Sequence, residues 1–388
     1  MKAIMLATGL ISIWSAGAIA QSTISDDFKS GALDWGLWCP CQVNMRDAPL
    51  TYSADPDQAG DQFVSIIADK ASLGGNVCRS RKPELECRPP AGTPEFTMFM
   101  SGVGAEATAS EADAVADSPE SLGPSFIRPR EMLSLDSTLG TLTKRAAQNP
   151  YCDDEALQHV QAAGEEGECI QRQELRPQSL HAHSMTIPYR YSIRFRMPDV
   201  IEDQKNSIRW VISQWKHEPI SAAYEKEFGE GWGPSPFLAQ RFDNGVLHVT
   251  IQDEHCRCMV ASAPLPNGSN LVWKDGPAQY CISTRPEDPP NFACVADLQV
   301  EYGPDPVLTS PRGRWVEMTY RVEAGRLGRA MVEIHQGDEF IVRVTGKIGY
   351  AVDPGQDSVI KFKFGPYRDY MPFVHTMDVD WLDIAPAD

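Results

Sequence analysis

The stretch YRYSIRFRM, residues 189 to 197, alternates apolar and polar side chains without interruption. Successive side chains of a β-strand point to opposite faces of its sheet, so this period of two predicts a strand with one buried face. The polar face carries three arginines and a serine. The apolar face consists of Tyr189, Tyr191, Ile193, Phe195 and Met197.

Other segments repeat this pattern. GVLHVTIQD (245–253) sets three aliphatic side chains against His248, and alternation also marks residues 314–325, 330–346 and 375–384. Many short strands, polar loops and no convincing long helix are typical of an antiparallel sandwich or jelly roll. We expect one all-β domain.

The beginning of the chain predicts export. Residues 1–20 combine one lysine, an apolar run and a final Ala18-Ile19-Ala20, which is the pattern of a signal peptide removed before Gln21. The apolar run is too short for a membrane span. We therefore expect a secreted or periplasmic protein, without a membrane partner, whose mature domain covers residues 21–388.

An acidic insertion interrupts the strands. Residues 104–123, GAEATASEADAVADSPESLG, are small and acidic and lack large apolar groups that could be buried. We extend this predicted mobile insertion loosely over residues 89–168.

Ten cysteines agree with export, because an even number in an exported chain favours disulfides. Three pairs are close enough in sequence to form local links: Cys78/Cys87, Cys152/Cys169 and Cys281/Cys294. Four cysteines remain: Cys39, Cys41, Cys256 and Cys258. They could form two long-range disulfides or a four-thiolate zinc site, and the spacing favours disulfides because structural zinc usually uses ligands two to four residues apart.

The net charge is −18. A general nucleic-acid-binding protein should carry a basic patch and a high pI, so we expect no nucleic-acid partner. An anionic ligand remains compatible with this charge, because a local basic cluster can lie within an acidic surface.

Such a cluster is predicted near the C-terminus. In KFKFGPYRDY (361–370), regular alternation turns the two phenylalanines toward a core. It places four residues on the other face: Lys361, Lys363, Gly365 and Tyr367.

The order of motifs along the chain resembles the jelly-roll polysaccharide lyases of the heparin-lyase and glucuronan-lyase group, which are similar to jelly-roll alginate lyases. The resemblance covers roughly residues 170 to 388. The motifs are QRQELRP (171–177), RWVISQWKHEP (209–219), SPFLAQRFDNGVLHVTI (235–251), GRWVEMTYRV (313–322), GDEFIVRVTG (337–346) and KFKFGPYRDYMP (361–372). It implies a concanavalin-like jelly roll with a concave substrate cleft. It also implies cleavage of a uronic-acid polysaccharide by β-elimination, which leaves a 4,5-unsaturated uronate end.

This reaction removes the proton at C5, beside the carboxylate, and expels the oxygen at C4. The enzyme must neutralise the carboxylate, stabilise the enolate-like charge and place a base and an acid within reach. By resemblance, Tyr367 matches the catalytic tyrosine and Lys363 the lysine four residues before it. A lysine beside a phenol is expected to lower the pKa of the phenol. Gly365 is expected to leave room for a sugar ring.

Arg172 and Glu174 match the family's arginine-x-glutamate strand, and Arg176 follows on the same face. The resemblance implies that Arg172 neutralises the substrate carboxylate, that Glu174 orients a basic side chain, and that Arg176 contacts substrate. The same residues would also suit a surface ion pair, which contributes little to stability.

The motif VISQWKHEP departs from the family's pattern of glutamine, one residue, then histidine. Here Lys216 lies two residues after Gln214, and the histidine is displaced to position 217. Either a β-bulge returns His217 to the face of Gln214, or Lys216 replaces it. Gln214 remains an amide donor to the carboxylate in both cases, and in the second Tyr367 acts as both base and acid.

His248 is a rival base on a polar strand face. Further substrate contacts are expected from Arg194, Arg241, Lys361 and Arg368. Each of these side chains could instead be an ordinary solvated residue.

The resemblance implies a monomer with an anionic polysaccharide substrate and no required cofactor. It leaves calcium open through acids such as Asp26, Asp27 and Asp383. Two alternatives stay open: a non-catalytic, lectin-like carbohydrate-binding module, and a glycoside hydrolase, for which a pair of carboxylates would be needed.

Overall fold

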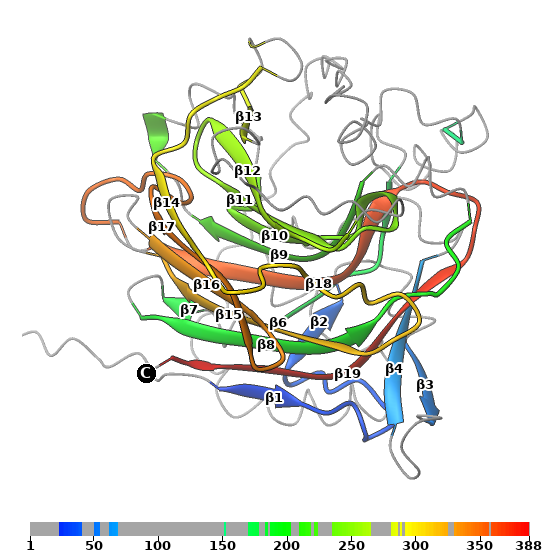
Figure 1. Ribbon diagram of the computed structural model, residues 1–388. Coiled ribbons are helices and arrows are strands. Elements are labelled where there is room, and N and C mark those ends of the chain that lie inside the picture. Colours follow the sequence, from blue (N-terminus) through cyan, green and yellow to red (C-terminus); the bar gives the residue numbers. More distant parts are fainter. Residues whose placement is uncertain are drawn as a thin grey trace, which may run out of the picture.

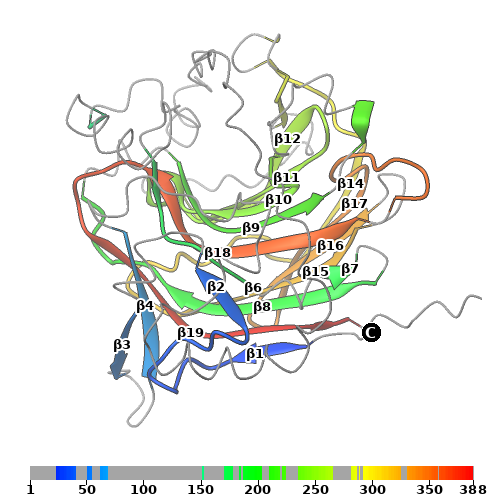
Figure 2. The same cartoon turned by 180° about the vertical axis from the view of Figure 1, so that it is seen from behind.

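The predicted all-β fold is confirmed by the computed structural model. The structure describes residues 23–40, 50–54, 62–68, 151–152, 170–177, 183–184, 187–202, 209–218, 221–223, 235–264, 281–285, 288, 292–324, 330–356 and 358–387. Named elements in these ranges are β-strands and the short 3-10 helix η6 (Asp243–Gly245). They form two antiparallel sheets stacked as a jelly-roll sandwich (Figures 1 and 2).

Sheet A holds the strand that first predicted the fold. Its spatial order is β14 (Leu298–Tyr302), β17 (Glu339–Gly346), β16 (Ala330–Gln336), β15 (Val316–Glu323), β8 (Tyr189–Arg196), β19 (His375–Pro386), β4 (Gln62–Ala68) and β3 (Thr51–Ala54), and β1 (Ile24–Asp26) pairs with β19.

Sheet B holds the motifs of the predicted site. Its spatial order is β13 (Cys281–Ser283), β12 (Cys256–Ser262), β11 (His248–Gln252), β10 (Leu238–Arg241), β9 (Trp210–Glu218), β18 (Val359–Asp369), β6 (Leu175–Pro177) and β2 (Trp38–Pro40). Two short strands also pair with β18: β5 (Ile170–Arg172) and β7 (His183–Ser184). Sheet B is curved, and its concave face points away from sheet A (Figure 1).

Aromatic side chains fill the space between the sheets. Trp215 of β9 is 1% exposed. Its ring centroid lies 5.5 Å from that of Tyr191, 4.8 Å from that of Tyr320 and 4.9 Å from that of Phe362. Large rings bury much apolar area, so these contacts contribute strongly to the core. All five apolar residues of the stretch 189–197 are buried, as predicted.

A β-bulge interrupts β18 in the middle of the predicted site. The register with β9 shifts between Phe364 and Tyr367. Gly365 has φ +115°, and a Cβ there would lie 2.2 Å from the carbonyl oxygen of Gln173. Glycine is therefore needed because the backbone at Gln173 crosses closely. The prediction that Gly365 leaves room for a sugar ring was wrong.

The disulfides correct one predicted pairing. Cys256 is bonded to Cys294 and Cys258 to Cys281, so the predicted local link between Cys281 and Cys294 was wrong. Cys258 and Cys281 face each other because β12 and β13 pair in that register. Since Cys39 is also disulfide-bonded, the four-thiolate zinc alternative is excluded.

The predicted signal peptide and nearly all of the predicted insertion lie outside the described residues, as do Cys41, Cys78, Cys87 and Cys169. No helix in the described ranges is both long and apolar enough to span a membrane.

Candidate functional site

Strand register places the candidate residues in rows across the concave face of sheet B. Tyr367 pairs with Val211, Val211 with Arg241, and Arg241 with His248. A second row joins Lys363 to Gln214. Neighbouring strands lie about 4.8 Å apart, so His248 is about 14 Å from Tyr367 across the sheet.

Tyr367 lies between strands that both supply cations. Arg172 of β5 pairs with it in register, and its guanidinium carbon lies 4.2 Å from the centroid of the tyrosine ring. Arg209, the residue before β9, lies 5.2 Å from the same centroid and donates from Nη1 to the Tyr367 hydroxyl at 3.2 Å. A phenol among cations is favoured in its ionised form.

Glu174 links the arginine motif to the glutamine motif. Its side chain is 1% exposed, and its Oε1 accepts a hydrogen bond from Nε2 of Gln214. Its Oε2 lies 3.6 Å from Nε of Arg172. One carboxylate thus orients an amide donor and a guanidinium on the same face of the sheet.

Two lysines complete this group of residues. Burial lowers the pKa of Lys363 to about 7; Glu174 raises this pKa, while Arg172, Lys216 and Arg176 lower it. Burial also lowers the pKa of Lys216, and the nearby Tyr367 oxygen opposes that shift. Neither ammonium forms an ion pair with a described residue. We call Arg172, Glu174, Arg176, Gln214, Lys216, Lys363 and Tyr367 the Tyr367 cluster.

His217 lies outside the Tyr367 cluster. It is 0% exposed, and its Nε2 accepts a hydrogen bond from the backbone N–H of Tyr350 at 2.7 Å. Burial lowers its pKa to about 4. The alternation of β9 therefore continues through positions 214 to 217, and Lys216 takes the place beside Tyr367. This placement corrects the prediction of His217 as a catalytic residue, because its side chain is buried on the other face of β9.

His248 belongs to a separate buried group. Its Nδ1 lies 3.0 Å from the carbonyl oxygen of Val246 and its Nε2 lies 3.5 Å from Oδ2 of Asp243. The same Oδ2 accepts a hydrogen bond from Nε of Arg241 at 2.7 Å. Arg241 and His248 thus lie on the predicted face, at some distance from Tyr367.

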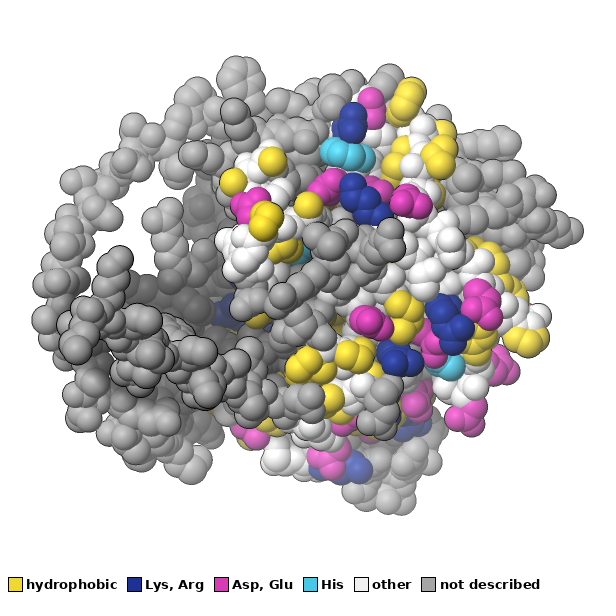
Figure 3. Space-filling model, turned by 90° about the vertical axis from the view of Figure 1, so that its left-hand side faces the viewer, with side chains coloured by type: hydrophobic (Ala, Val, Ile, Leu, Met, Phe, Trp, Pro, Cys, Tyr) yellow, Lys and Arg dark blue, Asp and Glu magenta, His cyan; other side chains and the backbone are white. Residues whose placement is uncertain are grey.

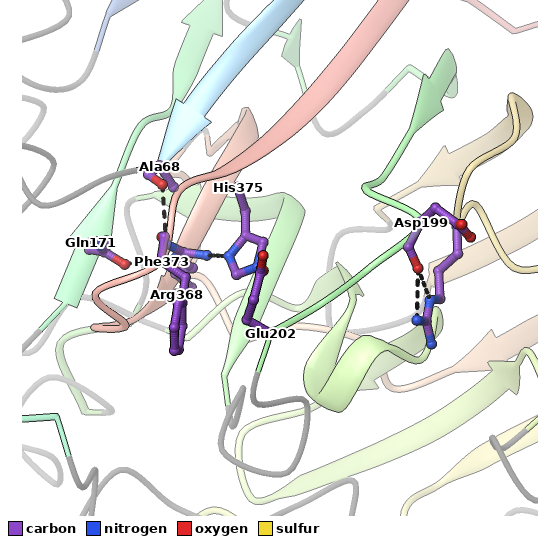
Figure 4. Close-up of polar contacts among 8 residues, drawn as sticks. Ala68, Gln171, Asp199, Glu202, Arg368, Phe373 and His375 are labelled. Carbon is purple, nitrogen blue, oxygen red and sulfur yellow. Dashed lines mark hydrogen bonds and ion pairs between the residues drawn. The ribbon is translucent and has the colours of Figure 1, made fainter.

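Two predicted substrate contacts, Arg368 and Arg194, lie elsewhere. Arg368 is buried, where Gln171, Ala68, Phe373 and His375 hold its guanidinium (Figure 4). Arg194 lies on the outer face of sheet A and pairs with Asp380. Lys361 is exposed and pairs with Glu218, and its position opposite Lys216 in register keeps it on the predicted face. The prediction that Arg368 and Arg194 contact substrate was wrong. Arg368 is part of the core, and Arg194 lies on the opposite sheet.

Sequence reasoning missed Arg209. Its Nη2 lies 2.6 Å and its Nε 2.9 Å from Oδ1 of Asp369, a residue that is 1% exposed. Arg209 precedes a strand, and no alternation pattern assigns it to a face. The acid that holds it lies 160 residues away in sequence, so only the pairing of β9 with β18 brings the two together.

The acids suggested for calcium have other contacts. Asp26 accepts hydrogen bonds from the Phe28 N–H and from Trp38 Nε1, and Asp383 pairs with Arg190. Among the described residues, no group of three or more His, Cys, Asp or Glu side chains is placed to hold a metal ion. Calcium binding stays an expectation.

Comparison with solved structures finds polysaccharide lyases at low similarity. Alginate lyase A1-II′ of polysaccharide lyase family 7 is 11% identical with a TM-score of 0.31, covering 56% of this chain and 72% of that chain. An endo-β-1,4-glucuronan lyase from the fungus Trichoderma reesei is 14% identical with a TM-score of 0.32, covering 57% and 77%. An alginate lyase in complex with dimannuronate is 10% identical with a TM-score of 0.29, covering 58% and 74%.

No protein-family model and no curated protein matches the chain. The structural similarities are too low to transfer a residue's role, so the function proposed below rests on the geometry of this chain.

Proposed function

We propose that the protein is an exported polysaccharide lyase that cleaves a uronic-acid polymer by β-elimination at the Tyr367 cluster. The observation that supports this proposal is a pair of partly buried lysines, Lys216 and Lys363, which lie near Arg172 and Glu174 and have no ion-pair partner among the described residues. Burying unbalanced positive charge lowers stability unless an anion arrives. A uronate carboxylate supplies such an anion.

Six of the seven residues of the cluster have a role in this chemistry. Arg172, Lys216 and Lys363 neutralise the carboxylate and stabilise the charge that develops on it when the C5 proton leaves. Gln214, held by Glu174, donates a hydrogen bond to the same carboxylate.

Tyr367 transfers the proton. Its phenolate removes the proton from C5, the bond between C4 and O4 breaks, and the phenol returns the proton to O4. The products are one chain with a 4,5-unsaturated end and one chain with a new hydroxyl, so no water and no oxidant is consumed. A single group acting on both atoms must lie on one side of the sugar ring.

The disulfides bear on the compartment in which the protein works. Disulfides persist best in oxidising compartments, so the two described disulfides support a place outside the cytoplasm.

A glycoside hydrolase would need two carboxylates flanking the bond. In the described part of the Tyr367 cluster the carboxylate is Glu174, which Gln214 and Arg172 already contact.

The test is a panel of uronate polysaccharides, including glucuronan, alginate and heparin-like chains, monitored for the ultraviolet absorbance of the unsaturated product. We expect one polymer to give a steady absorbance increase that is abolished in the Tyr367→Phe variant. Binding of a polymer without any absorbance gain would overturn the proposal and favour the lectin-like alternative.

A further inference from the structure

We propose that Arg209 is a positioning residue that holds the hydroxyl of Tyr367 and favours its ionised form, with Asp369 as its anchor. This inference rests on the function proposed above for Tyr367. It adds to the proton-transfer step a residue that begins the motif RWVISQWKHEP but was not singled out from the sequence.

The geometry joins three side chains in series. The guanidinium of Arg209 donates from Nε and Nη2 to Oδ1 of Asp369 and from Nη1 to the Tyr367 hydroxyl. A guanidinium is rigid and planar, so fixing two of its nitrogens on a carboxylate also fixes the direction of the third. The phenol oxygen therefore receives a positioned donor.

The backbone makes this arrangement stiff. The N–H of Asp369 donates to the carbonyl oxygen of Arg209 at 2.9 Å, and the next two positions pair as Arg368 with Trp210 and Tyr367 with Val211. Tyr367 and Asp369 lie two residues apart on β18, so both side chains point to the same face of the strand. Arg209, directly before the neighbouring strand β9, contacts both side chains.

The chain offers a matched control on the other sheet. Arg196 pairs with Asp378 at 3.0 Å, and its guanidinium carbon lies 4.6 Å from the centroid of the Trp315 ring. Its side chain is 19% exposed, against 15% for Arg209. If losing any arginine stacked on an aromatic ring changed turnover, both Arg209→Gln and Arg196→Gln would show the change. A change that acts through Tyr367 would appear only in Arg209→Gln.

The first measurement follows the pH dependence of kcat for Arg209→Gln, Arg209→Lys and Arg196→Gln. A charge this close typically moves an ionisation by about one pH unit or more. We expect the acidic limb of the Arg209→Gln profile to move upward by about that amount, with KM changed less than about threefold. The acidic limb of the Arg209→Lys profile should shift less, because lysine keeps the positive charge but lacks the planar guanidinium that binds Asp369 and Tyr367 together. Arg196→Gln should match the wild type.

The second measurement needs no substrate. The alkaline absorbance titration of the wild type, minus that of Tyr367→Phe, isolates the ionisation of one phenol. The same difference is taken in the Arg209→Gln and Arg209→Lys backgrounds. We expect the midpoint to rise with Arg209→Gln by about one pH unit or more and with Arg209→Lys by less.

The outcomes separate the two proposals. A shifted titration without activity on any uronate would leave the role of Arg209 standing and overturn the lyase. Lyase activity with an unchanged titration and pH profile would overturn the role of Arg209 alone. If Arg209→Gln fails to fold because Asp369 loses its partner, Arg209→Lys carries the test, and unchanged values in that variant would overturn the inference.

Discussion

Arginines stack on aromatic rings on both sheets, and the two sites differ in how their charges are balanced. On the outer face of sheet A, three arginines of β8 each pair with an aspartate of β19: Arg190 with Asp383, Arg194 with Asp380 and Arg196 with Asp378. In the Tyr367 cluster, two arginines and two lysines surround one carboxylate, Glu174.

The difference distinguishes a charge-balanced site on sheet A from the proposed binding site on sheet B. The surface drawn in Figure 3 shows basic side chains lying beside acidic ones, as expected for a protein whose exposed charges are paired. Lys216 and Lys363 are partly buried and, in the described part of the chain, have no such partner. Uncompensated cations beside a tyrosine lower stability, so an anionic ligand is the simplest physical reason for keeping them. The predictions below test this contrast.

The largest effect is expected at Tyr367. Tyr367→Phe keeps the ring beside Arg172 and removes only the hydroxyl, so folding and polymer binding should persist. General acid–base groups contribute about 100- to 10,000-fold, and a group used in both steps should lie near the top of that range. We therefore expect kcat to fall by about 1,000-fold or more, measured by product absorbance. A near-wild-type rate would overturn the mechanism.

The second prediction distinguishes two neighbouring residues of β9, Lys216 and His217. Lys216→Ala should lower kcat about 100-fold, as when one donor to a developing charge is lost. His217→Ala should instead lower the unfolding free energy by about 2 to 4 kcal/mol, because it opens a buried cavity and leaves the Tyr350 N–H without its acceptor. The turnover of folded His217→Ala protein should change little. If His217→Ala lowered kcat and Lys216→Ala did not, His217 would be the catalytic residue, as in the lyases that the sequence resembles.

The third effect concerns pH and stability at Lys363. Its pKa is about 7 in the folded protein, against an ordinary value of 10.5. Between these values the unfolded chain carries a proton that the folded protein lacks, so stability rises with pH and is lost as pH falls toward 7. Lys363→Met should remove this slope and be more stable than the wild type at pH 7, by up to a few kcal/mol.

Urea unfolding at several pH values between 7 and 10 measures this difference. Lys361→Met is the matched control, because Lys361 lies on the same strand as Lys363 but is exposed and paired with Glu218 of β9. Equal slopes for the wild type and Lys363→Met would contradict the burial of an unbalanced charge.

The smallest effect is expected on sheet A. Arg196→Gln removes a partly buried ion pair and a ring contact, so the unfolding free energy should fall by about 1 kcal/mol. Turnover should stay within about twofold, since the residue lies on the opposite sheet. A tenfold loss of turnover at unchanged stability would mean that both faces take part in catalysis.

Local patterns in the sequence were sufficient for the strands and for much of the Tyr367 cluster. The alternation of 189–197 predicted β8, and the spacing of two in QRQELRP placed Arg172 and Glu174 on one face. The stretch KFKFGPYRDY predicted the strand β18 but not the bulge within it. Alternation has a period of two residues, so it can be read wherever a strand is regular.

The sequence by itself therefore determined which side chains share a face of a strand, and the tertiary structure decided which strands bring those faces together. Arg209 meets Tyr367, Cys256 meets Cys294 and Arg368 enters the core through pairings and crossings that join distant parts of the chain. The bulge at Gly365 likewise depends on a neighbouring backbone. Side-chain alternation is a local property of the backbone, whereas strand register depends on the packing of the whole sandwich.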